Sequence, residues 1–196
     1  MSRKKIFNPE ETMKDSARLL ELLRKLSLEK RDVTLSSGRK SNYYVDGKQT
    51  TLNPEGIYLA GKLLYRRIRS LPVRADAVGG LTLGADPLVS AIALWSQFEQ
   101  DPLPAYIVRK EPKGHGTGAW MEGLKNVPPA ARVVIVEDVV TTGDSALRAI
   151  ARSEEAGFQV VKVMALLDRM EGGKEKLKEK GHELESIFNR EELLGS

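Results

Sequence analysis

The sequence feature that most restricts the fold is an alternation of short β-branched runs with helical segments over residues 75–167. These segments predict an ordered series of strands and helices, with strands at 75–78, 105–108, 133–136 and 160–167 and helices at 87–98 and 145–155. Such a pattern is typical of an α/β fold, in which a central, mostly parallel sheet is flanked by helices. Ligands of these sheets bind at the carboxyl ends of the strands, so we expect the chemistry directly after each run.

The residues before this series have a different pattern. Asn8-Pro9 and Asn53-Pro54 each place a capping asparagine before a proline, which predicts that two helices start there. Between these helices, two short strands at 32–36 and 42–46 are expected to flank a turn. We therefore expect a small N-terminal subdomain over residues 1–50 and a core domain over residues 51–196. The core is predicted to end with an exposed helix at 172–180 and an edge strand at 182–188.

Composition excludes several kinds of chemistry. The 196 residues include no cysteine and two isolated histidines, which rules out disulfides, thiolate nucleophiles and cysteine zinc sites. Any metal is therefore expected to be hard and oxygen-bound. The longest uncharged stretch is too short to cross a bilayer, and the charged N-terminus lacks an apolar signal core, so we expect a cytoplasmic protein without a membrane partner. The net charge of +4 does not by itself imply a nucleic-acid partner.

The strongest local signal is the segment 133–145, in which a β-branched strand ends in Glu137 and Asp138 and a hydroxyl-rich turn leads into a helix. Backbone N–H groups of the turn and the helix dipole suit a phosphate, and Thr141, Thr142 and Ser145 add hydroxyl donors. The acids would repel a phosphate but suit the neutral hydroxyls of a ribose, so the segment predicts a sugar-phosphate site. The alternative is a generic strand-to-helix turn capped by Asp144.

This segment resembles the phosphoribosyl-diphosphate signature of the type I phosphoribosyltransferases, which implies that fold with a small N-terminal hood. The resemblance implies that Glu137 and Asp138 contact the ribose hydroxyls and that the turn through Ser145 holds the 5′-phosphate. Binding of 5-phosphoribosyl 1-diphosphate (PRPP) is thereby expected along one continuous segment: Glu137, Asp138, Val139, Val140, Thr141, Thr142, Gly143, Asp144 and Ser145.

A basic, glycine-rich segment follows the strand at 105–108. Residues 109–118 contain three cations, a histidine and three glycines, a composition that favours a mobile cationic loop suited to a pyrophosphate leaving group. The alternative is a solvated basic surface loop. The segment resembles the catalytic loop of the orotate phosphoribosyltransferases, which implies PRPP-binding roles for Arg109, Lys110, Lys113 and His115. In that family the loop reaches into the neighbouring subunit, which implies a homodimer with shared active sites.

Three further segments bear on the substrates. Residues 34–46 resemble the element that covers the pyrimidine in this family, although their aromatic residues also suit simple packing. Arg169 follows a predicted strand, and an arginine fork suits the carboxylate of orotate, so the resemblance implies that Thr141 and Arg169 contact orotate. A surface arginine paired with a neighbouring acid is the alternative. The loop at 79–86 occupies the place of the family's pyrophosphate loop, but Ser36 and Gly84 stand where many members carry lysine.

The resemblance as a whole implies transfer of ribose 5-phosphate from PRPP to orotate, giving orotidine 5′-monophosphate and pyrophosphate in pyrimidine nucleotide synthesis. Lys110, Lys113, His115 and Asp138 are the expected catalytic residues. Mg²⁺ is the expected cofactor, held mainly by the substrate and not by a protein metal site. Two alternatives stay open: a phosphoribosyltransferase for a purine base, and a non-catalytic regulator that senses PRPP and binds nucleic acid through basic surface.

Overall fold

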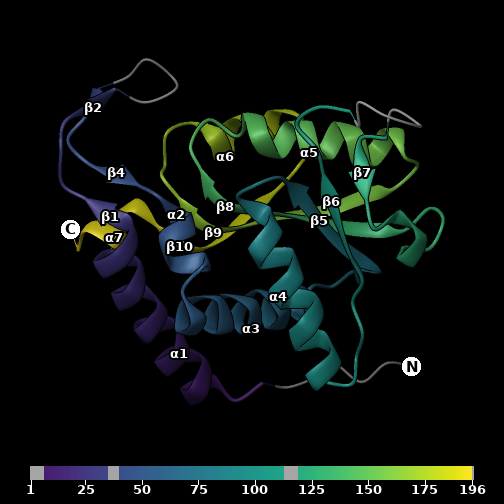
Figure 1. The fold of residues 1–196 in the computed structure, drawn as a ribbon, viewed down its shortest axis with the longest axis horizontal. Helices are drawn as coiled ribbons and strands as arrows, with labels where there is room; N and C mark the ends of the chain where they lie inside the picture. The colour runs from purple at the N-terminus through teal and green to yellow at the C-terminus, as the bar shows by residue number, and fades with distance from the viewer. Residues whose placement is uncertain (1–6, 35–39, 113–118, 196) are drawn as a thin grey trace.

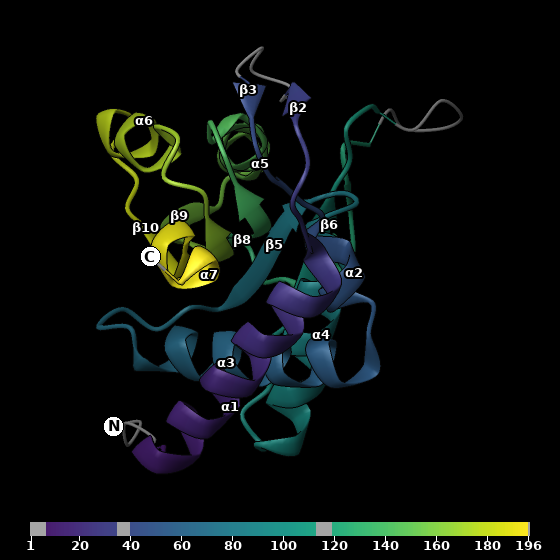
Figure 2. The same ribbon diagram turned by 90° about the vertical axis from the view of Figure 1, so that its left-hand side faces the viewer.

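The computed structural model describes residues 7–34, 40–112 and 119–195. They form three layers, with the main sheet in the middle, α5 and α6 on one side, and α1, α3 and α4 on the other (Figure 1). A view turned by 90° shows the same layers, with the β2–β3 pair projecting beyond the core (Figure 2). The predicted α/β fold with a mostly parallel central sheet flanked by helices is confirmed.

The main sheet has the strand order β10-β9-β8-β5-β6-β7, and only β7 is antiparallel to its neighbour. Its strands are β5 (Ala77–Leu81), β6 (Ala105–Val108), β7 (Met121–Glu122), β8 (Arg132–Val140), β9 (Gln159–Asp168) and β10 (Leu184–Asn189). The two central strands β5 and β8 are buried on both faces, which is why the sequence shows them as almost continuous apolar runs.

Helices cover both faces of this sheet and begin largely where the capping residues predict. The helices are α1 (Pro9–Leu22), α2 (Gly47–Thr51), α3 (Pro54–Ser70), α4 (Ala85–Phe98), α5 (Asp144–Glu155), α6 (Gly173–Glu179) and α7 (Arg190–Leu194). The side chain of Asn8 accepts a hydrogen bond from the backbone of Glu10, and that of Asn53 accepts from Glu55 and Gly56, so both predicted helix starts are confirmed. Helix α1 continues into a π-helical turn over Leu23–Ser27.

The region before α2, where a small subdomain is expected, contains two small antiparallel pairs. Strands β2 (Val33–Thr34) and β3 (Lys40–Ser41) pair with each other, whereas β4 (Tyr44–Val45) pairs with β1 (Leu28–Glu29). The predicted pairing of a strand at 32–36 with one at 42–46 is therefore wrong, and most of the predicted turn lies outside the described residues. Helix α1 is held on α3 by Lys62, whose ammonium group lies 2.6 Å from Glu11 and 2.7 Å from Asp15. The expected boundary at residue 50 stays a prediction; α2 runs across it.

Some strand boundaries differ from the prediction. Strand β5 covers 77–81 and not 75–78, and β8 continues to Val140, four residues beyond the predicted end. The extension of β8 has a physical reason, because β9 is long enough to pair with Val139 and Val140 through Leu167 and Asp168. The two acids therefore lie within the strand and not at its end. Within the described residues no helix is both long and apolar enough to span a membrane.

Candidate active site

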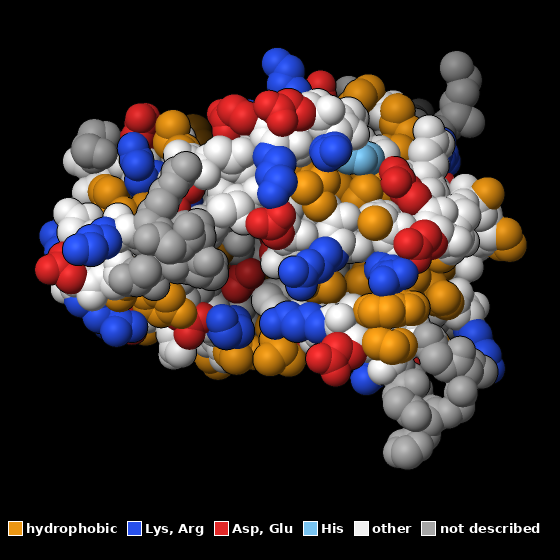
Figure 3. All heavy atoms as spheres, turned by 90° about the horizontal axis from the view of Figure 1, so that it is seen from above, with side chains coloured by type: hydrophobic (Ala, Val, Ile, Leu, Met, Phe, Trp, Pro, Cys, Tyr) orange, Lys and Arg blue, Asp and Glu red, His pale blue; other side chains and the backbone are white. Residues whose placement is uncertain are grey.

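A cavity of about 430 Å³ lies at the carboxyl end of β8. Its walls come from β5, β8, the turn that follows β8, the first turn of α5 and the segment after β6: Leu81, Lys110, Glu137, Val139, Val140, Thr141, Thr142, Gly143, Asp144, Ser145, Ala146 and Arg148. Figure 3 shows a hollow in the upper face of the molecule, with Lys and Arg side chains around it and an acidic side chain deep inside. The segment predicted to hold a sugar phosphate therefore surrounds one cavity, with Asp138 as its exception.

The turn between β8 and α5 presents the start of a helix to this cavity. Gly143 has φ of 80°, a left-handed backbone conformation that residues with a side chain rarely adopt. A Cβ at this position would also lie 3.1 Å from the backbone oxygen of Gly173. Asp144 does not cap α5: its carboxylate accepts from Thr142 at 2.7 Å and pairs with Lys176 at 2.5 Å, which lowers its pKa. Without a side-chain cap, the N–H groups at the start of α5 remain available to an anion.

Glu137 lies at the floor of the cavity with 5% of its surface exposed. Its Oε1 atom is buried and has no hydrogen-bond partner among the described residues. Burial is the main cause that raises the pKa of this carboxyl well above its ordinary value; the neighbouring Asp138 raises it further, and Lys110 opposes the shift. An orphaned oxygen of this kind suits a hydroxyl donor or a cation brought in by a ligand.

Asp138 faces away from this cavity, as successive strand residues do. Its carboxylate lies against two glycines: a Cβ on Gly84 would be 2.3 Å from Oδ1, and a Cβ on Gly47 would be 3.0 Å from Oδ2. The backbone N–H of Val139 donates to Oδ1 at 2.9 Å, yet burial dominates and raises the pKa of Asp138. The side chains of Glu137 and Asp138 therefore lie on opposite sides of β8. Gly84 leaves room for one of these acids.

The basic segment reaches the cavity through Lys110, which is exposed and lines it. Arg109 does not line this cavity; its guanidinium lies 3.2 Å from Glu122, and its backbone N–H donates to Trp120. The predicted site residues Lys113 and His115 lie outside the described residues.

Arg169 lies beside the cavity and not in its lining. Its backbone N–H donates to Val140 at 2.9 Å, and its side chain, 4% exposed, pairs with Glu171 at 2.9 Å. The guanidinium also stacks over the ring of Tyr43 at 4.5 Å from the centroid. Glu137 and Thr141 thus share a cavity, while Arg169 connects the end of β9 to Tyr43.

Two residues near the site, Lys48 and Arg148, were missed by the sequence interpretation. Lys48 pairs with Asp46 at 2.6 Å, which raises the pKa of Lys48, and it acts electrostatically on Asp138. Leu81 and Arg148 line the cavity. The position of Arg148 could have been predicted from the sequence. It lies four residues after the start of a predicted helix, and side chains four residues apart lie on the same face of a helix. The position of Lys48 could not, because only the fold of α2 brings it to β8.

No group of three or more His, Cys, Asp or Glu residues suited to a metal ion occurs in the described parts of the chain. Glu137 and Asp138 nevertheless offer hard oxygen donors, and the unpartnered Oε1 of Glu137 has room for a ligand. These residues fit a hard divalent ion carried by a substrate, since such an ion keeps most of its ligands from phosphate and water.

A central parallel strand that leads through a buried acid into an open helix start is suited to a phosphorylated sugar, and the chain belongs to the phosphoribosyltransferases. Residues 46–190 match the phosphoribosyl transferase domain family. Within that class the chain belongs to the orotate phosphoribosyltransferase family. It is 48% identical to the orotate phosphoribosyltransferase of Aquifex aeolicus over 185 residues, which cover 93% of this chain and 99% of that protein. It is also 48% identical to the one from Nostoc sp. over 87% of this chain and 81% of the relative.

Solved structures agree with this assignment. The orotate phosphoribosyltransferase of Mycobacterium tuberculosis in complex with PRPP superposes with a TM-score of 0.75 at 37% identity, covering 91% of this chain and 98% of that one. The adenine phosphoribosyltransferase of Leishmania tarentolae superposes with a TM-score of 0.63 at 19% identity, covering 91% of this chain and 90% of that one, which shows a shared fold alone. The predicted family is confirmed.

Proposed function

We propose that this chain transfers ribose 5-phosphate from PRPP to orotate, releasing pyrophosphate and forming orotidine 5′-monophosphate for pyrimidine nucleotide synthesis. One observation carries the proposal: a buried, unpartnered Glu137 and an uncapped helix start face the same cavity of about 430 Å³. A ribose phosphate matches both, since its hydroxyls suit the acid and its phosphate suits the helix start.

In this proposal the described residues act by electrostatics and positioning. Bond cleavage leaves positive charge on the ribose ring. Glu137 offsets this charge from within the cavity, and the predicted catalytic residue Asp138 acts at longer range from the far side of β8. Lys110 stands at the cavity wall, where it neutralises negative charge on the diphosphate, and the predicted partners Arg109, Lys113 and His115 complete this role. No covalent nucleophile is required, because the developing cation is captured by the base.

Mg²⁺ is the proposed cofactor. Bound with the diphosphate, it would supply neutralisation of the leaving group. Glu137 is the residue proposed to face it or its water ligands, since its Oε1 has no partner among the described residues. The protein contributes few direct ligands in this proposal, and the substrate contributes most.

Orotate recognition is proposed for Thr141 and Arg169. Thr141 lines the phosphate cavity, and Arg169 lies at the adjacent strand end beneath Tyr43. A carboxylate on a planar ring would compete with Glu171 for the guanidinium of Arg169, and the Tyr43 ring offers an apolar cover. This pairing would select a base that carries an acid group.

A homodimer is the proposed assembly, in the cytoplasm and without a nucleic-acid partner. Support comes from an apolar groove of about 590 Å³ along α3 and α4, where Leu52, Leu94 and Phe98 are 70%, 62% and 71% exposed. Helix α4 also begins next to Asp138, so a second copy seated on this groove would lie beside the active site. Apolar patches of this kind are typical of subunit interfaces.

A spectrophotometric assay that follows orotate with PRPP and Mg²⁺ tests the proposal. We expect turnover with orotate and none with adenine, guanine or xanthine, because only orotate carries the carboxylate for Arg169. Turnover with a purine and not with orotate would support the purine enzyme. Absence of all turnover together with salt-sensitive DNA binding would support the regulator.

A further inference from the structure

Arg148 stands out among the cations near the active site. It is exposed on α5 and lines both the phosphate cavity and an adjoining cavity of about 350 Å³, which share Leu81 and Lys110. Over residues 7–34, 40–112 and 119–195, no hydrogen bond or ion pair engages its guanidinium. It acts electrostatically on Asp144, but Lys176 and Thr142 already hold that carboxylate.

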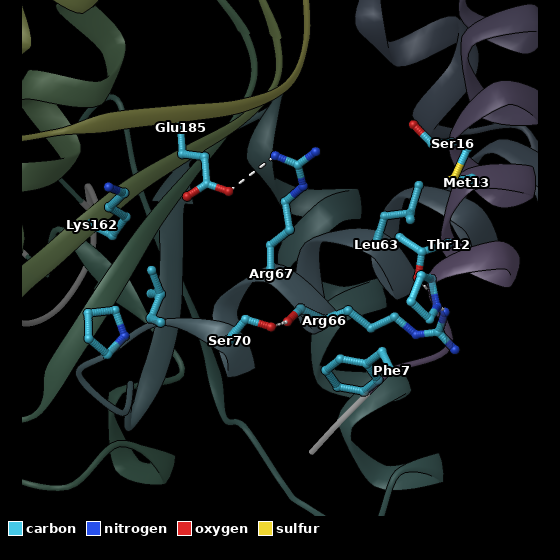
Figure 4. A pocket seen from close by; sticks show the side chains of 13 residues that line it. Phe7, Thr12, Met13, Ser16, Leu63, Arg66, Arg67, Ser70, Lys162 and Glu185 are labelled. Atoms are coloured by element: carbon cyan, nitrogen blue, oxygen red, sulfur yellow. Dashed lines mark hydrogen bonds and ion pairs between the residues drawn. The ribbon is translucent and has the colours of Figure 1, made fainter. Parts of the chain in front are cut away.

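Two arginines that line other cavities are engaged by acids. One turn further along α5, Arg152 pairs with Glu155 at 2.6 Å and stacks on Trp120 at 3.6 Å from the ring centroid. A separate cavity of about 690 Å³, between α1, α3 and the sheet, contains Arg67, which points to Glu185 across it at 3.1 Å (Figure 4). That cavity has no uncompensated charge to attract an anion, whereas the phosphate cavity has Arg148 and Lys110.

The helix geometry directs Arg148 toward the phosphate turn. Side chains on an α-helix lean toward its N-terminus, so a residue covers the turn that precedes its own Cα. Arg148 lies four residues after Asp144, the first residue of α5, and therefore covers the uncapped start of the helix. A phosphate at that start would receive backbone N–H groups from below and a guanidinium from the side.

We propose that Arg148 binds the 5′-phosphate that the PRPP donor and the nucleotide product share. The inference rests on the proposed function and adds a substrate-binding residue to it. The 5′-phosphate takes no part in bond cleavage, so its contact with Arg148 is equally strong before and during the reaction. Such a contact lowers KM and leaves kcat largely unchanged.

The test compares two ligands on the full chain by calorimetry: orotidine 5′-monophosphate and the nucleoside orotidine, which lacks the phosphate. We expect Arg148→Gln to weaken the nucleotide about tenfold or more, as for a lost charge-assisted hydrogen bond, and to leave the nucleoside unchanged. Arg148→Lys should recover part of the loss. The matched control is Arg152→Gln, whose charge Glu155 already compensates; its nucleotide affinity should equal that of the wild type.

Steady-state kinetics give an independent readout. Arg148→Gln should raise KM for PRPP by a similar factor with kcat within about twofold of the wild type. Equal nucleotide affinity in Arg148→Gln and wild type, or equal losses for nucleotide and nucleoside, would overturn the inference while leaving the proposed function intact. A wild-type chain that binds no orotidine 5′-monophosphate and turns over no orotate would overturn both.

Discussion

Glu137 and Asp138 show how much neighbouring residues of one chemical type can differ. Both are buried on β8, but Glu137 faces the cavity with an unpartnered oxygen, whereas Asp138 accepts a backbone hydrogen bond and fills the space beside Gly84. A buried carboxylate without a partner costs free energy when it is ionised. The folded protein therefore carries an unfavourable group at the place where a ligand is to bind.

The first prediction concerns the stability of Glu137→Gln. Because the folded-state pKa of Glu137 lies well above the ordinary value of 4.5, the folded state keeps a proton that the unfolded state has lost. Stability of the wild type is therefore lost as pH rises from about 4.5 through the folded-state pKa. We expect Glu137→Gln, which cannot ionise, to be more stable than the wild type at pH 8 and to lose that advantage at pH 5, as measured by urea unfolding.

Glu183→Gln is the control for this experiment. Glu183 is exposed and Lys162 lowers its pKa, so its substitution should give no gain at pH 8. A stability difference between Glu137→Gln and wild type that does not change with pH would contradict the assignment of a raised pKa.

At the scale of elements, the contact between β5 and β6 depends on the absence of a side chain. The ring of Tyr106 on β6 lies over Gly79 on β5, and its hydroxyl lies 2.8 Å from Ser153 on α5. A Cβ on Gly79 would lie 2.1 Å from the Tyr106 ring. This glycine thereby lets one aromatic residue of β6 pack over β5 and reach α5.

We expect Gly79→Ala to destabilise the protein by about 1–3 kcal/mol, because a buried ring must move in a close-packed core. Thermal and urea unfolding measure this cost. Gly172→Ala is the control. Gly172 has φ of 96°, and no atom lies within 4 Å of a new Cβ, so the substitution introduces backbone strain alone. We expect it to cost about 1 kcal/mol of stability. Equal costs in the two variants would show that the ring contact is unimportant.

The elements also show what the sequence can predict and what it cannot. Capping at Asn8 and Asn53 is local, so both helix starts were predictable from neighbouring residues. The end of β8 depends on its partner β9, and β4 pairs with β1, a strand distant from it in the sequence, so neither could be read from a local pattern. The phosphate turn was predictable because one continuous segment forms it, whereas Lys48 reaches Asp138 only through the tertiary fold.

At the scale of the whole molecule, the apolar groove on α3 and α4 shares no lining residue with the phosphate cavity. We expect the wild type to be a dimer and Phe98→Glu to be a monomer, because a charge placed at the centre of an apolar interface opposes association. Sedimentation velocity at micromolar concentration measures the oligomeric state of both proteins. If the active sites are shared between subunits, the turnover of Phe98→Glu should also fall.

Met13→Glu is the matched control for association. Met13 is 72% exposed on α1, close to the 71% of Phe98, but lies outside the groove on α3 and α4. It should leave the dimer intact. A wild type that sediments as a monomer, or a Phe98→Glu variant that remains dimeric, would contradict a subunit interface at this groove.

The positions of the two tryptophans have a practical consequence for spectroscopy. Trp120 stacks on Arg152 in the cavity that adjoins the phosphate site, whereas Trp95 contacts Tyr58 and Phe98 on the apolar groove. Each indole is thus an intrinsic fluorophore for one event. A Trp95→Phe protein would report occupancy of the nucleotide site by its emission, and a Trp120→Phe protein would report burial of the groove.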